Sequence, residues 1–474
     1  MKAYTLTGYG DASKAQMREV ERPVPGPGEV LVRVRAAGLN SVDYKIRDGM
    51  LKPILQLDLP TTLGNELAGI VEANGKGARR FLPGTRVMAR VGKERLGAFA
   101  EYAVVREEFL TDIPESLDFK TAAAIPLAGL TALQALRDEL QVKPGFRVLI
   151  TGGAGGVGTF AIQIAKHLGA EVVTTASQRG RDLVKDMGAD VVIDYEHEKF
   201  EDVIDPVDGA FDLIGGDTLS RTFGVVKKGG RVVSIAGMPE PRTATKDLDG
   251  RYGLAAMFWF ASLKFRAQAA RAGVDYRYLF MHPSGSELAY LAEMAHRRLL
   301  KPVIDSTYPF EKIDEAMAEL EEGHRGRDQD TDDDAQIRHD TGKPRHQADQ
   351  QRELESDDRQ ANGVDDAQTQ HHQQLPAQEG TQHLIAVMRQ TRGGGLHMAR
   401  QQALQLLLHA VPVEQQIEGD DGNQRQIAQP DGHRQPGLGD GAQQRGGEGA
   451  GLFPVAQQQR ADLIEVGAEI QPGE

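Results

Sequence analysis

The stretch GGAGGVG holds the most specific group of residues that could do chemistry. Gly153, Gly155 and Gly158 satisfy the spacing G-x-G-x-x-G, directly after the strand-like RVLIT and before the apolar TFAIQIAKHLG. In such a turn Gly153 permits the tight bend, Gly155 leaves room for a pyrophosphate, and Gly158 lets a helix lie close to the strand. The anion then lies at the helix amino end, beside the backbone of Gly156 and Val157. This context predicts a dinucleotide-binding site.

A second group of residues follows the next strand-like run and bears on which dinucleotide is bound. An Asp or Glu at the end of that strand would hydrogen-bond the adenosine ribose and reject a 2′-phosphate, but the chain reads TTASQRGRD there. Ser177 and Arg179, with Arg181 as a further candidate, could hold a phosphate through a hydroxyl and guanidinium groups. These residues favour NADPH over NADH. The alternative is that the arginines only cap a surface loop.

A carboxylate, Glu66, lies inside the apolar, glycine-punctuated run LGNELAG. Burying its charge there is unfavourable unless something pairs with it. Three interpretations are open at this point: a metal ligand, a catalytic base, or a structural residue with a partner. The histidines His167, His197, His282 and His296 are scattered with no i,i+4 pair, so they support neither a metal site nor a catalytic triad.

Composition restricts the function classes further. The 474 residues have room for about three domains and include no cysteine, which excludes disulfides, thiolate metal sites and cysteine nucleophiles. The formal net charge of −14 and the lack of a Lys/Arg stripe argue against nucleic-acid binding. No signal-peptide core is present, and no segment reaches the roughly 20 apolar residues of a membrane span. We expect a cytoplasmic protein that acts on a small molecule, with no membrane partner.

Two kinds of unit must position these residues. Residues 1–120 contain short strand-like pieces such as VLVRVRAAGL and LAGIVEAN between Gly and Pro turns, which predicts a small all-β domain. Residues 121–284 alternate helical and strand-like runs, which predicts parallel pairing in a doubly wound sheet. The predicted fold class is therefore α/β, with a β-rich domain beside the parallel sheet.

The chain changes character after Arg325. Residues 326–474 are rich in Gln, with Phe453 as their single Phe, Tyr or Trp and Lys343 as their single Lys. Such a segment has too few bulky apolar residues for a large core. We expect a low-complexity tail that is either mostly disordered or an off-frame extension. The stretch MARQQALQLLLHAVPVEQQI could form one marginal amphipathic helix.

Several motifs together resemble one family. GLNSVDYKIRDG, LGNELAG, GAFAEYAVV, IPLAGLTA, GGAGGVG and VIDYEHE are similar to stretches of the medium-chain dehydrogenase/reductase superfamily, over roughly residues 1–325. They are most similar to its zinc-free branch of NADPH quinone oxidoreductases and enone reductases. The resemblance implies a GroES-like β-barrel catalytic domain over residues 1–120, to which residues 285–325 return, and a Rossmann domain over residues 121–284.

The resemblance also implies a site without metal. Zinc-dependent members of the superfamily have a Cys three residues before an Asp and a His before a Glu; here Asn40 precedes Asp43, and Asn65 precedes Glu66. Without zinc to polarise an alcohol, the implied reaction is hydride transfer from NADPH to a quinone or to the C=C bond of an α,β-unsaturated carbonyl. The alternatives are a non-catalytic, crystallin-like NADPH-binding protein and an enoyl-thioester reductase. Glu66 then has no metal to serve, so the structural interpretation leads.

The resemblance implies a role for individual residues as well. Asn40 and Asp43 would lie beside the nicotinamide, and Thr131 would contact that end of the cofactor. Tyr44 would orient a carbonyl or relay a proton, or else is a packed core residue. Some relatives have a Tyr where this chain has Lys45. Three further cofactor contacts are implied. Tyr195 would approach the adenosine end, Gly237 lies at a strand end facing the ligand crevice, and Phe280 would pass the nicotinamide.

Three expectations concern the surroundings of the site. Met257, Phe258, Trp259 and Phe260 could line an apolar substrate pocket, or belong to a helical core or a subunit interface. Relatives pair their subunits edge to edge near YRYLFMHPSG, which implies a homodimer. Relatives also end in an apolar strand, but here the helix EKIDEAMAELEEGH is followed by RGRDQDTDDD. The closing strand is therefore expected to be missing, with lower stability as the result.

Overall fold

The computed structural model describes residues 1–93, 95–322 and 384–388. The chain divides into two compact units, Met1–Ala410 and Val411–Glu474, and every described residue belongs to the first. The disorder predicted for residues 326–474 lies outside the described residues, except at positions 384–388, and so does the helix predicted in MARQQALQLLLHAVPVEQQI. Within the described part of the chain, no helix is long and apolar enough to cross a membrane.

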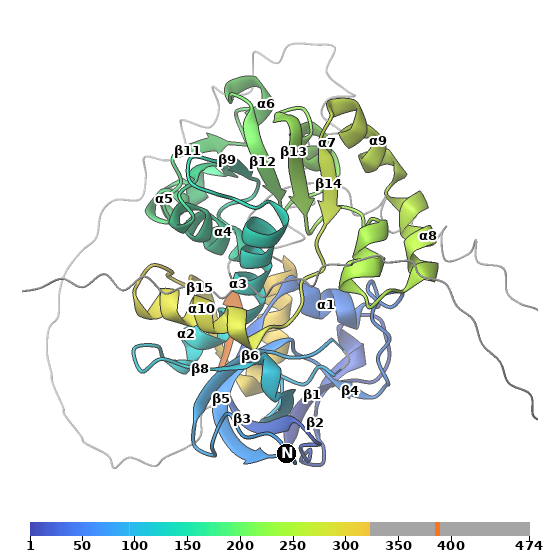
Figure 1. The fold of residues 1–474 in the computed structure, drawn as a ribbon. Helices are drawn as coiled ribbons and strands as arrows, with labels where there is room; N and C mark the ends of the chain where they lie inside the picture. The colour runs from blue at the N-terminus through green and yellow to red at the C-terminus, as the bar shows by residue number, and fades with distance from the viewer. Residues whose placement is uncertain (94, 323–383, 389–474) are drawn as a thin grey trace, which may run out of the picture. The chain divides into compact units, whose positions relative to one another are not determined.

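The amino-terminal domain is built mainly from antiparallel strands (Figure 1). Its strands are β1 (Lys2–Leu6), β2 (Ala15–Glu19), β3 (Glu29–Leu39), β4 (Thr61–Thr62), β5 (Glu66–Asn74), β6 (Arg86–Arg90), β7 (Tyr102–Arg106), β8 (Leu110–Asp112), β15 (Ile304–Pro309) and β16 (Leu384–Met388). A three-stranded sheet has the order β2-β1-β4. The larger sheet has the order β15-β16-β3-β5-β6-β8, with β7 also paired to β3.

Strand β3 shows how the sequence forms this domain. Val30, Val32 and Val34 recur at every second position and are buried, which is the period of a strand with one face in a core. They join one apolar core with residues of the neighbouring strands. β3 ends at Leu39, and Asn40 is then the N-cap of helix α1 (Ser41–Arg47). The candidate catalytic residues therefore start where the longest strand of the domain stops.

The second domain contains a six-stranded parallel sheet in the order β11-β10-β9-β12-β13-β14. Its strands are β9 (Arg147–Ile150), β10 (Glu171–Ala176), β11 (Val191–Asp194), β12 (Val207–Asp212), β13 (Val226–Ser234) and β14 (Asp275–Tyr278). From β9 the chain adds β10 and β11 on one side of the sheet, and it then crosses over to add β12, β13 and β14 on the other side. The boundary between β9 and β12 is the switch point at which such sheets bind ligands. The predicted doubly wound sheet is confirmed.

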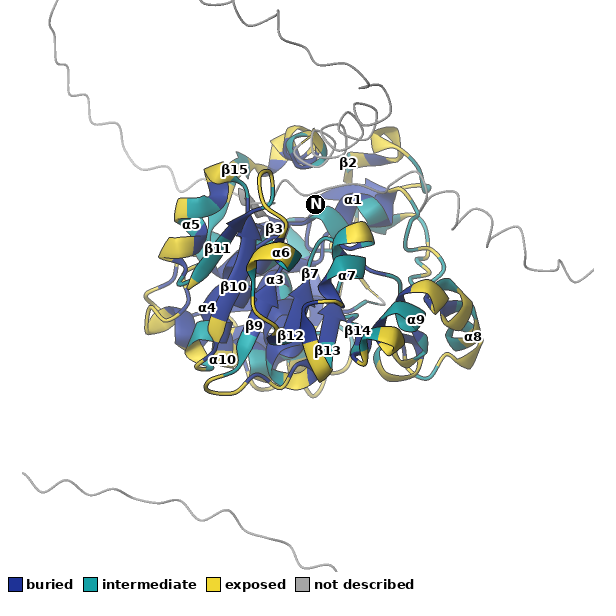
Figure 2. Ribbon diagram, turned by 90° about the horizontal axis from the view of Figure 1, so that it is seen from above, coloured by how far each residue is buried: buried dark blue, intermediate teal, exposed yellow. Residues whose placement is uncertain are grey.

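Helices cover both faces of this sheet, and Figure 2 shows the strands buried between them. Val148 and Ile150 of β9 belong to one apolar core, while Leu149 between them belongs to another on the opposite face.

Besides α1, the labelled α-helices of the described chain are α2 (Phe119–Ala123), α3 (Pro126–Leu133), α4 (Gly156–His167), α5 (Arg181–Asp186), α6 (Phe200–Val203), α7 (Gly216–Thr222), α8 (Tyr252–Ala261), α9 (Leu263–Ala272) and α10 (Gly285–His296). The 3₁₀ turns are η1 (Ala12–Lys14), η2 (Glu107–Phe109), η4 (Gln178–Gly180) and η6 (Phe310–Lys312), and the π-helical segments are η3 (Gln134–Glu139) and η5 (Thr243–Asp247).

The last strand of the β domain comes from inside the predicted tail. Strand β16, the short orange strand in Figure 1, pairs antiparallel with β15 and parallel with β3. The expectation that the closing strand is missing is therefore wrong, because LIAVM supplies it. Sequence reasoning missed the strand because residues 323–383 separate it from the preceding helical residues 313–322, in a segment of disorder-like composition. Ile313, Met317 and Leu320 of that helix pack in the β-domain core.

Candidate active site

The glycine turn lies between β9 and α4, at the carboxyl edge of the parallel sheet. Sequence reasoning assigned the tight bend to Gly153, but the positive φ of 72° falls on Gly152. Gly153 is required for space instead, because a Cβ there would lie 2.1 Å from Oγ1 of Thr174 in β10. A Cβ on Gly158 would lie 2.4 Å from the carbonyl oxygen of Gly152. The first turn of α4 thus packs directly on the bend.

The amino end of α4 offers hydrogen-bond donors to a ligand. Gly155 is the N-cap, and no side chain caps this helix end. The first-turn N–H groups, which include those of Gly156, Val157 and Gly158, have no acceptor within the helix. These donors and the helix dipole together favour a bound anion. The glycine cradle therefore fits the phosphates of a dinucleotide.

Ser177, Arg179 and Tyr195 follow neighbouring strands at the same edge of the sheet. Ser177 comes directly after β10, and the backbone N–H of Tyr195, just beyond β11, donates to the Ala176 carbonyl at 3.3 Å. Arg179 is exposed, and no carboxylate of the described residues forms an ion pair with it. Its charge is therefore available to a phosphate group of a ligand.

Asp212, at the end of β12, organises the loops around this edge, and sequence reasoning did not single it out. Its buried carboxylate accepts hydrogen bonds from the Thr151 hydroxyl at 3.1 Å, the Ser234 hydroxyl at 2.6 Å and the Gly215 N–H at 3.0 Å. Burial raises the pKa of Asp212, while these donors oppose the rise. Ser234 Oγ in turn accepts the N–H of Gly237 at 2.7 Å. Asp212 thus holds the turns after β9, β12 and β13 together.

Thr131 and Phe280, the residues implied at the nicotinamide end, approach the site from two different elements. The buried Thr131 hydroxyl donates to the Leu127 carbonyl inside α3, at 2.7 Å. The Phe280 N–H donates to Asp247 Oδ2 at 3.0 Å, and Nζ of Lys93 lies 4.9 Å from the Phe280 ring centroid. Because Lys93 belongs to the β domain, Phe280 lies where the two domains meet. Cofactor contact by these two residues stays a prediction.

Four side chains of the β domain form a buried network of amides and carboxylates. Asn40 Nδ2 donates to Glu66 Oε1 at 2.5 Å, and Asn65 Nδ2 donates to Asp43 Oδ1 at 2.7 Å. The Asn40 backbone N–H donates to Asp43 Oδ2 at 2.8 Å. Glu66 Oε2 accepts the Leu127 N–H at 2.6 Å. The direct hydrogen-bond partners of Glu66 are therefore an amide side chain and the amino end of α3, which has no side-chain cap of its own.

The surroundings of this network are shaped to hold it. Gly38 lies opposite Glu66 in the β3–β5 pairing, and a Cβ there would lie 2.1 Å from Glu66 Oε1. Asn65 is fully buried, and its Oδ1 has no hydrogen-bond partner among the described residues. A buried acceptor of this kind is unfavourable unless a donor reaches it. Asn65 Oδ1 is therefore an acceptor to which a ligand or a water molecule can donate a hydrogen bond.

Burial raises the pKa of both carboxyl groups, Asp43 and Glu66, to about 7. The hydrogen bond from Asn65 opposes the rise at Asp43, and the hydrogen bond from Leu127 opposes it at Glu66. The charge of Asp43 adds to the rise at Glu66, and the charge of Arg90 opposes the rise at both. The network is therefore poised to hold or release a proton near neutral pH.

Tyr44 and the aromatic residues of α8 are placed differently from one another. Tyr44 is 5% exposed and packs in the apolar core of the β domain, so its catalytic role stays a prediction beside the packing alternative. Phe258 is buried in a small cluster that also includes Phe280. Trp259 and Phe260 are 43% and 67% exposed. These two rings face solvent rather than line a pocket in the described chain.

The fold and the site together define a class, the NAD(P)-dependent dehydrogenases and reductases. Residues 26–115 match the family described as alcohol dehydrogenase GroES-like domain, and residues 187–326 match the family described as zinc-binding dehydrogenase. The GroES-like domain and the parallel sheet are both as the resemblance implied. The second family name does not specify this chain's metal content, because the chain has amides at two zinc-ligand positions and no cysteine.

Curated relatives are similar over the same part of the chain. A chloroplastic quinone oxidoreductase from Triphysaria versicolor is 32% identical over 335 residues, which cover 68% of this chain and 96% of the relative. A chloroplastic NADPH-dependent alkenal/one oxidoreductase from Arabidopsis thaliana is 38% identical over 251 residues, or 51% of this chain and 64% of that protein.

Solved structures agree with these relatives. The quinone oxidoreductase from Coxiella burnetii has a TM-score of 0.60 at 31% identity, covering 68% of this chain and 96% of that one. The Escherichia coli quinone oxidoreductase complexed with NADPH has a TM-score of 0.57 at 25% identity, with the same coverage of the two chains. This chain belongs to the medium-chain dehydrogenase/reductase superfamily, with quinone oxidoreductases among its relatives.

Proposed function

We propose that this protein reduces a quinone or the C=C bond of an α,β-unsaturated carbonyl with NADPH, without zinc. The observation that carries the proposal is the buried network of Asn40, Asp43, Asn65 and Glu66. Its amides stand where the zinc-dependent members have a Cys and a His, and both amides donate to carboxylates of the network instead. Alcohol oxidation without a Lewis acid loses its main source of rate. A quinone or enone already has an electron-poor carbon that can accept hydride.

The cofactor fits the edge of the parallel sheet for reasons that this structure provides. The close approaches at Gly153 and Gly158 leave no room for a Cβ, and the uncapped amino end of α4 suits a pyrophosphate. Ser177 and Arg179 would hold the 2′-phosphate, which favours NADPH over NADH. When bound, the dinucleotide supplies the hydride.

The protein's own residues would bind and orient the acceptor. Asn40 would donate its second amide N–H to the carbonyl oxygen of a substrate. The raised pKa of Asp43 and Glu66 would let the network supply the proton that the substrate takes up after hydride transfer. The Tyr44 hydroxyl is the other candidate proton relay. The substrate would lie between this network and the segment of Phe280.

The direct test is a turnover panel. Purified protein is mixed with NADPH and a series of quinones and enones, and the absorbance of the reduced nicotinamide is followed. We expect turnover of at least one member of the panel, with slower turnover when NADH replaces NADPH. Binding of NADPH without turnover of any acceptor would favour the non-catalytic alternative. Enoyl thioesters are added to the panel as a comparison, and turnover restricted to them would favour the enoyl-thioester reductase alternative.

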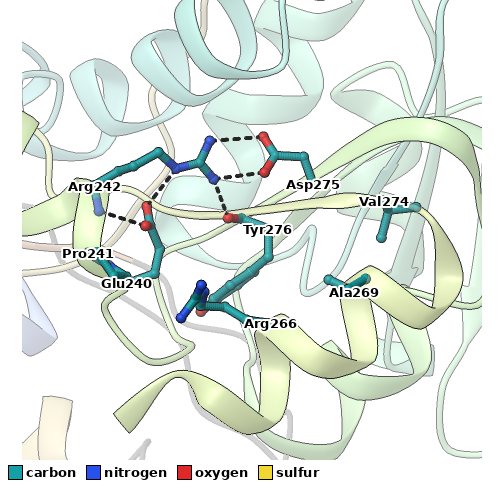
Figure 3. Close-up of a pocket in the computed structure, with 9 residues that line it drawn as sticks. Glu240, Pro241, Arg242, Arg266, Ala269, Val274, Asp275 and Tyr276 are labelled. Carbon is teal, nitrogen blue, oxygen red and sulfur yellow. Dashed lines mark hydrogen bonds and ion pairs between the residues drawn. The ribbon is translucent and has the colours of Figure 1, made fainter. Parts of the chain in front are cut away.

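We also propose a homodimer that pairs through β14, the edge strand of the parallel sheet. Beside it lies a cavity of about 380 Å³, in which Arg242 forms a double ion pair with Asp275 (Figure 3). The neighbouring helices α8 and α9 expose Trp259, Phe260 and Leu263. An edge strand beside exposed apolar side chains favours pairing with a second chain. Light scattering should give twice the chain mass, and Phe260→Asp should shift it toward the monomer.

The cytoplasmic location expected from the sequence is a further proposal. The names of several relatives place those proteins in chloroplasts or mitochondria, so an organelle is the competing outcome. Fractionation of cells that express the full chain with a carboxyl-terminal tag would distinguish the two.

A further inference from the structure

A short segment, residues 280–282, passes the carboxyl edge of the parallel sheet and contains Phe280. It follows β14 directly, and the preceding Leu279 N–H donates to the carbonyl of Ser234, the last residue of β13, at 3.0 Å. Ligands of such sheets bind at the carboxyl ends of the strands. The position of this segment therefore shapes the crevice at its β13–β14 side.

Gln134 holds this segment by a pair of hydrogen bonds, one donated and one accepted. Its Nε2 donates to the His282 carbonyl at 2.9 Å, and its Oε1 accepts the His282 N–H at 3.1 Å. Nε2 also donates to Glu287 Oε2 at 2.7 Å. Gln134 is 1% exposed, so water does not compete for these bonds. The side chain thus satisfies both backbone groups of His282, as a strand partner would.

The other end of the segment is held from the opposite side. Asp247 Oδ2 accepts the Phe280 N–H, and both Asp247 oxygens accept from Nη2 of the buried Arg277 at 2.6 Å. This anchor lies within the dinucleotide domain. Gln134 belongs to the same domain but follows α3, which carries Thr131 and whose Leu127 N–H donates to Glu66 of the β domain. Gln134 therefore links the segment to the helix that contacts the amide–carboxylate network.

We infer that Gln134 is a positioning residue of the cofactor site, which fixes residues 280–282 relative to α3 and so sets the distance between Phe280 and Thr131. This inference rests on the proposed function. A bound nicotinamide would need both residues at fixed positions, and small displacements of positioning groups strongly reduce turnover. Sequence reasoning did not find Gln134, because its partner is backbone far along the chain.

The chain offers a matched control in Gln163 of α4. Gln163 Nε2 donates to the Lys301 carbonyl at 3.1 Å, and its Oε1 accepts the Lys301 N–H at 2.7 Å. Its Nε2 also donates once more, to the Thr159 carbonyl at 3.0 Å. Each glutamine therefore makes a pair of hydrogen bonds to the backbone N–H and carbonyl of one distant residue. The pair made by Gln163 holds the segment after α10 rather than residues 280–282.

The experiment compares Gln134→Met with Gln163→Met in the full chain. Met has a similar helix propensity and no hydrogen-bonding group that can replace the amide. Three quantities are measured: the melting temperature, the amide hydrogen exchange of residues 279–282 in the protein without cofactor, and the affinity for NADPH from nicotinamide fluorescence. Where the wild type turns over, kcat and KM are measured as well.

We expect both variants to lose a similar amount of thermal stability. Gln134→Met alone should speed exchange at residues 279–282 and weaken NADPH binding by about 10-fold, with a comparable loss of kcat/KM. Unchanged exchange at residues 279–282 would overturn the inference whatever the function of the protein. Faster exchange with NADPH affinity equal to that of Gln163→Met would also overturn it. A wild type that binds NADPH but reduces no acceptor would instead count against the proposed function.

Discussion

Replacing Glu66 by Gln should change how the stability of the protein depends on pH. Burial is the main cause of the raised pKa of Glu66, from 4.5 to about 7. Between these values the folded protein holds a proton on Glu66 that the unfolded chain has released. Stability from this group is therefore fully present below pH ~4.5 and is lost as the pH rises through ~7.

The size of the effect follows from the shift. A rise from 4.5 to about 7, at ~1.4 kcal/mol per pH unit, corresponds to roughly 3 kcal/mol of unfolding free energy. Gln cannot ionise, so Glu66→Gln should lose this dependence and become more stable relative to the wild type as the pH rises. Asp43 also has a raised pKa, so part of the slope should remain in the variant.

The assay is urea unfolding of both proteins, followed by circular dichroism, at several values between pH ~3 and ~8. Glu139→Gln provides the control with the opposite sign. Burial works against ionisation of Glu139 too, but the hydrogen bond from Lys246 and the charge of Arg277 lower its pKa overall. Glu139→Gln should therefore lose stability relative to the wild type as the pH rises through the acid range, and then stay level. If the difference in unfolding free energy between Glu66→Gln and the wild type stayed constant between pH ~5 and ~8, the reasoning would be refuted.

Three further substitutions test other parts of the site. Arg179→Ala should raise KM for NADPH by about 10-fold and leave KM for NADH unchanged, because one charge-assisted hydrogen bond to the 2′-phosphate is lost; equal effects on both cofactors would contradict this role. Gly158→Val should abolish NADPH binding in fluorescence titrations, since a Cβ would lie 2.4 Å from the Gly152 carbonyl oxygen, and normal affinity would show that the turn can shift. Ala386→Pro should lower unfolding free energy by about 1–3 kcal/mol, because proline cannot donate to either strand beside β16. An unchanged urea midpoint would mean that β16 adds no stability.

Much of the fold could be predicted because its signals are local. The strand RVLIT, the glycine turn and the following helix are adjacent in sequence, and the alternation of strands and helices indicates parallel pairing by itself. Asn40 and Asp43 could be singled out because they share one short motif. Even so, the sequence led us to the wrong reason for a glycine at position 153. A side chain there is excluded by Thr174, which belongs to a different strand.

The parts that could not be predicted depend on partners far apart in the chain. Glu66 accepts hydrogen bonds from Asn40 and from the backbone of Leu127. A backbone partner cannot be predicted from residue types, because every residue except proline has the same backbone N–H. The same is true of Gln134 and His282. Asp212 was not singled out in the strand-like stretch FDLIGG, although it accepts hydrogen bonds from Thr151 and Ser234, which are 61 and 22 residues away in the chain, and from the nearby Gly215. Long-range hydrogen bonds, rather than residue types, define this site.

The position of β16 also has a consequence for synthesis of the protein. Leu384 pairs with Ala36 and Val387 pairs with Leu39, so the stretch of β3 just before Asn40 receives one of its two neighbours only after just over four-fifths of the chain has been made. At ~5–20 residues per second the delay is on the order of 20–70 s. During that time one edge of β3 stays open to other partners. A nascent chain of this protein would depend on chaperones longer than one whose closing strand follows the last helix directly.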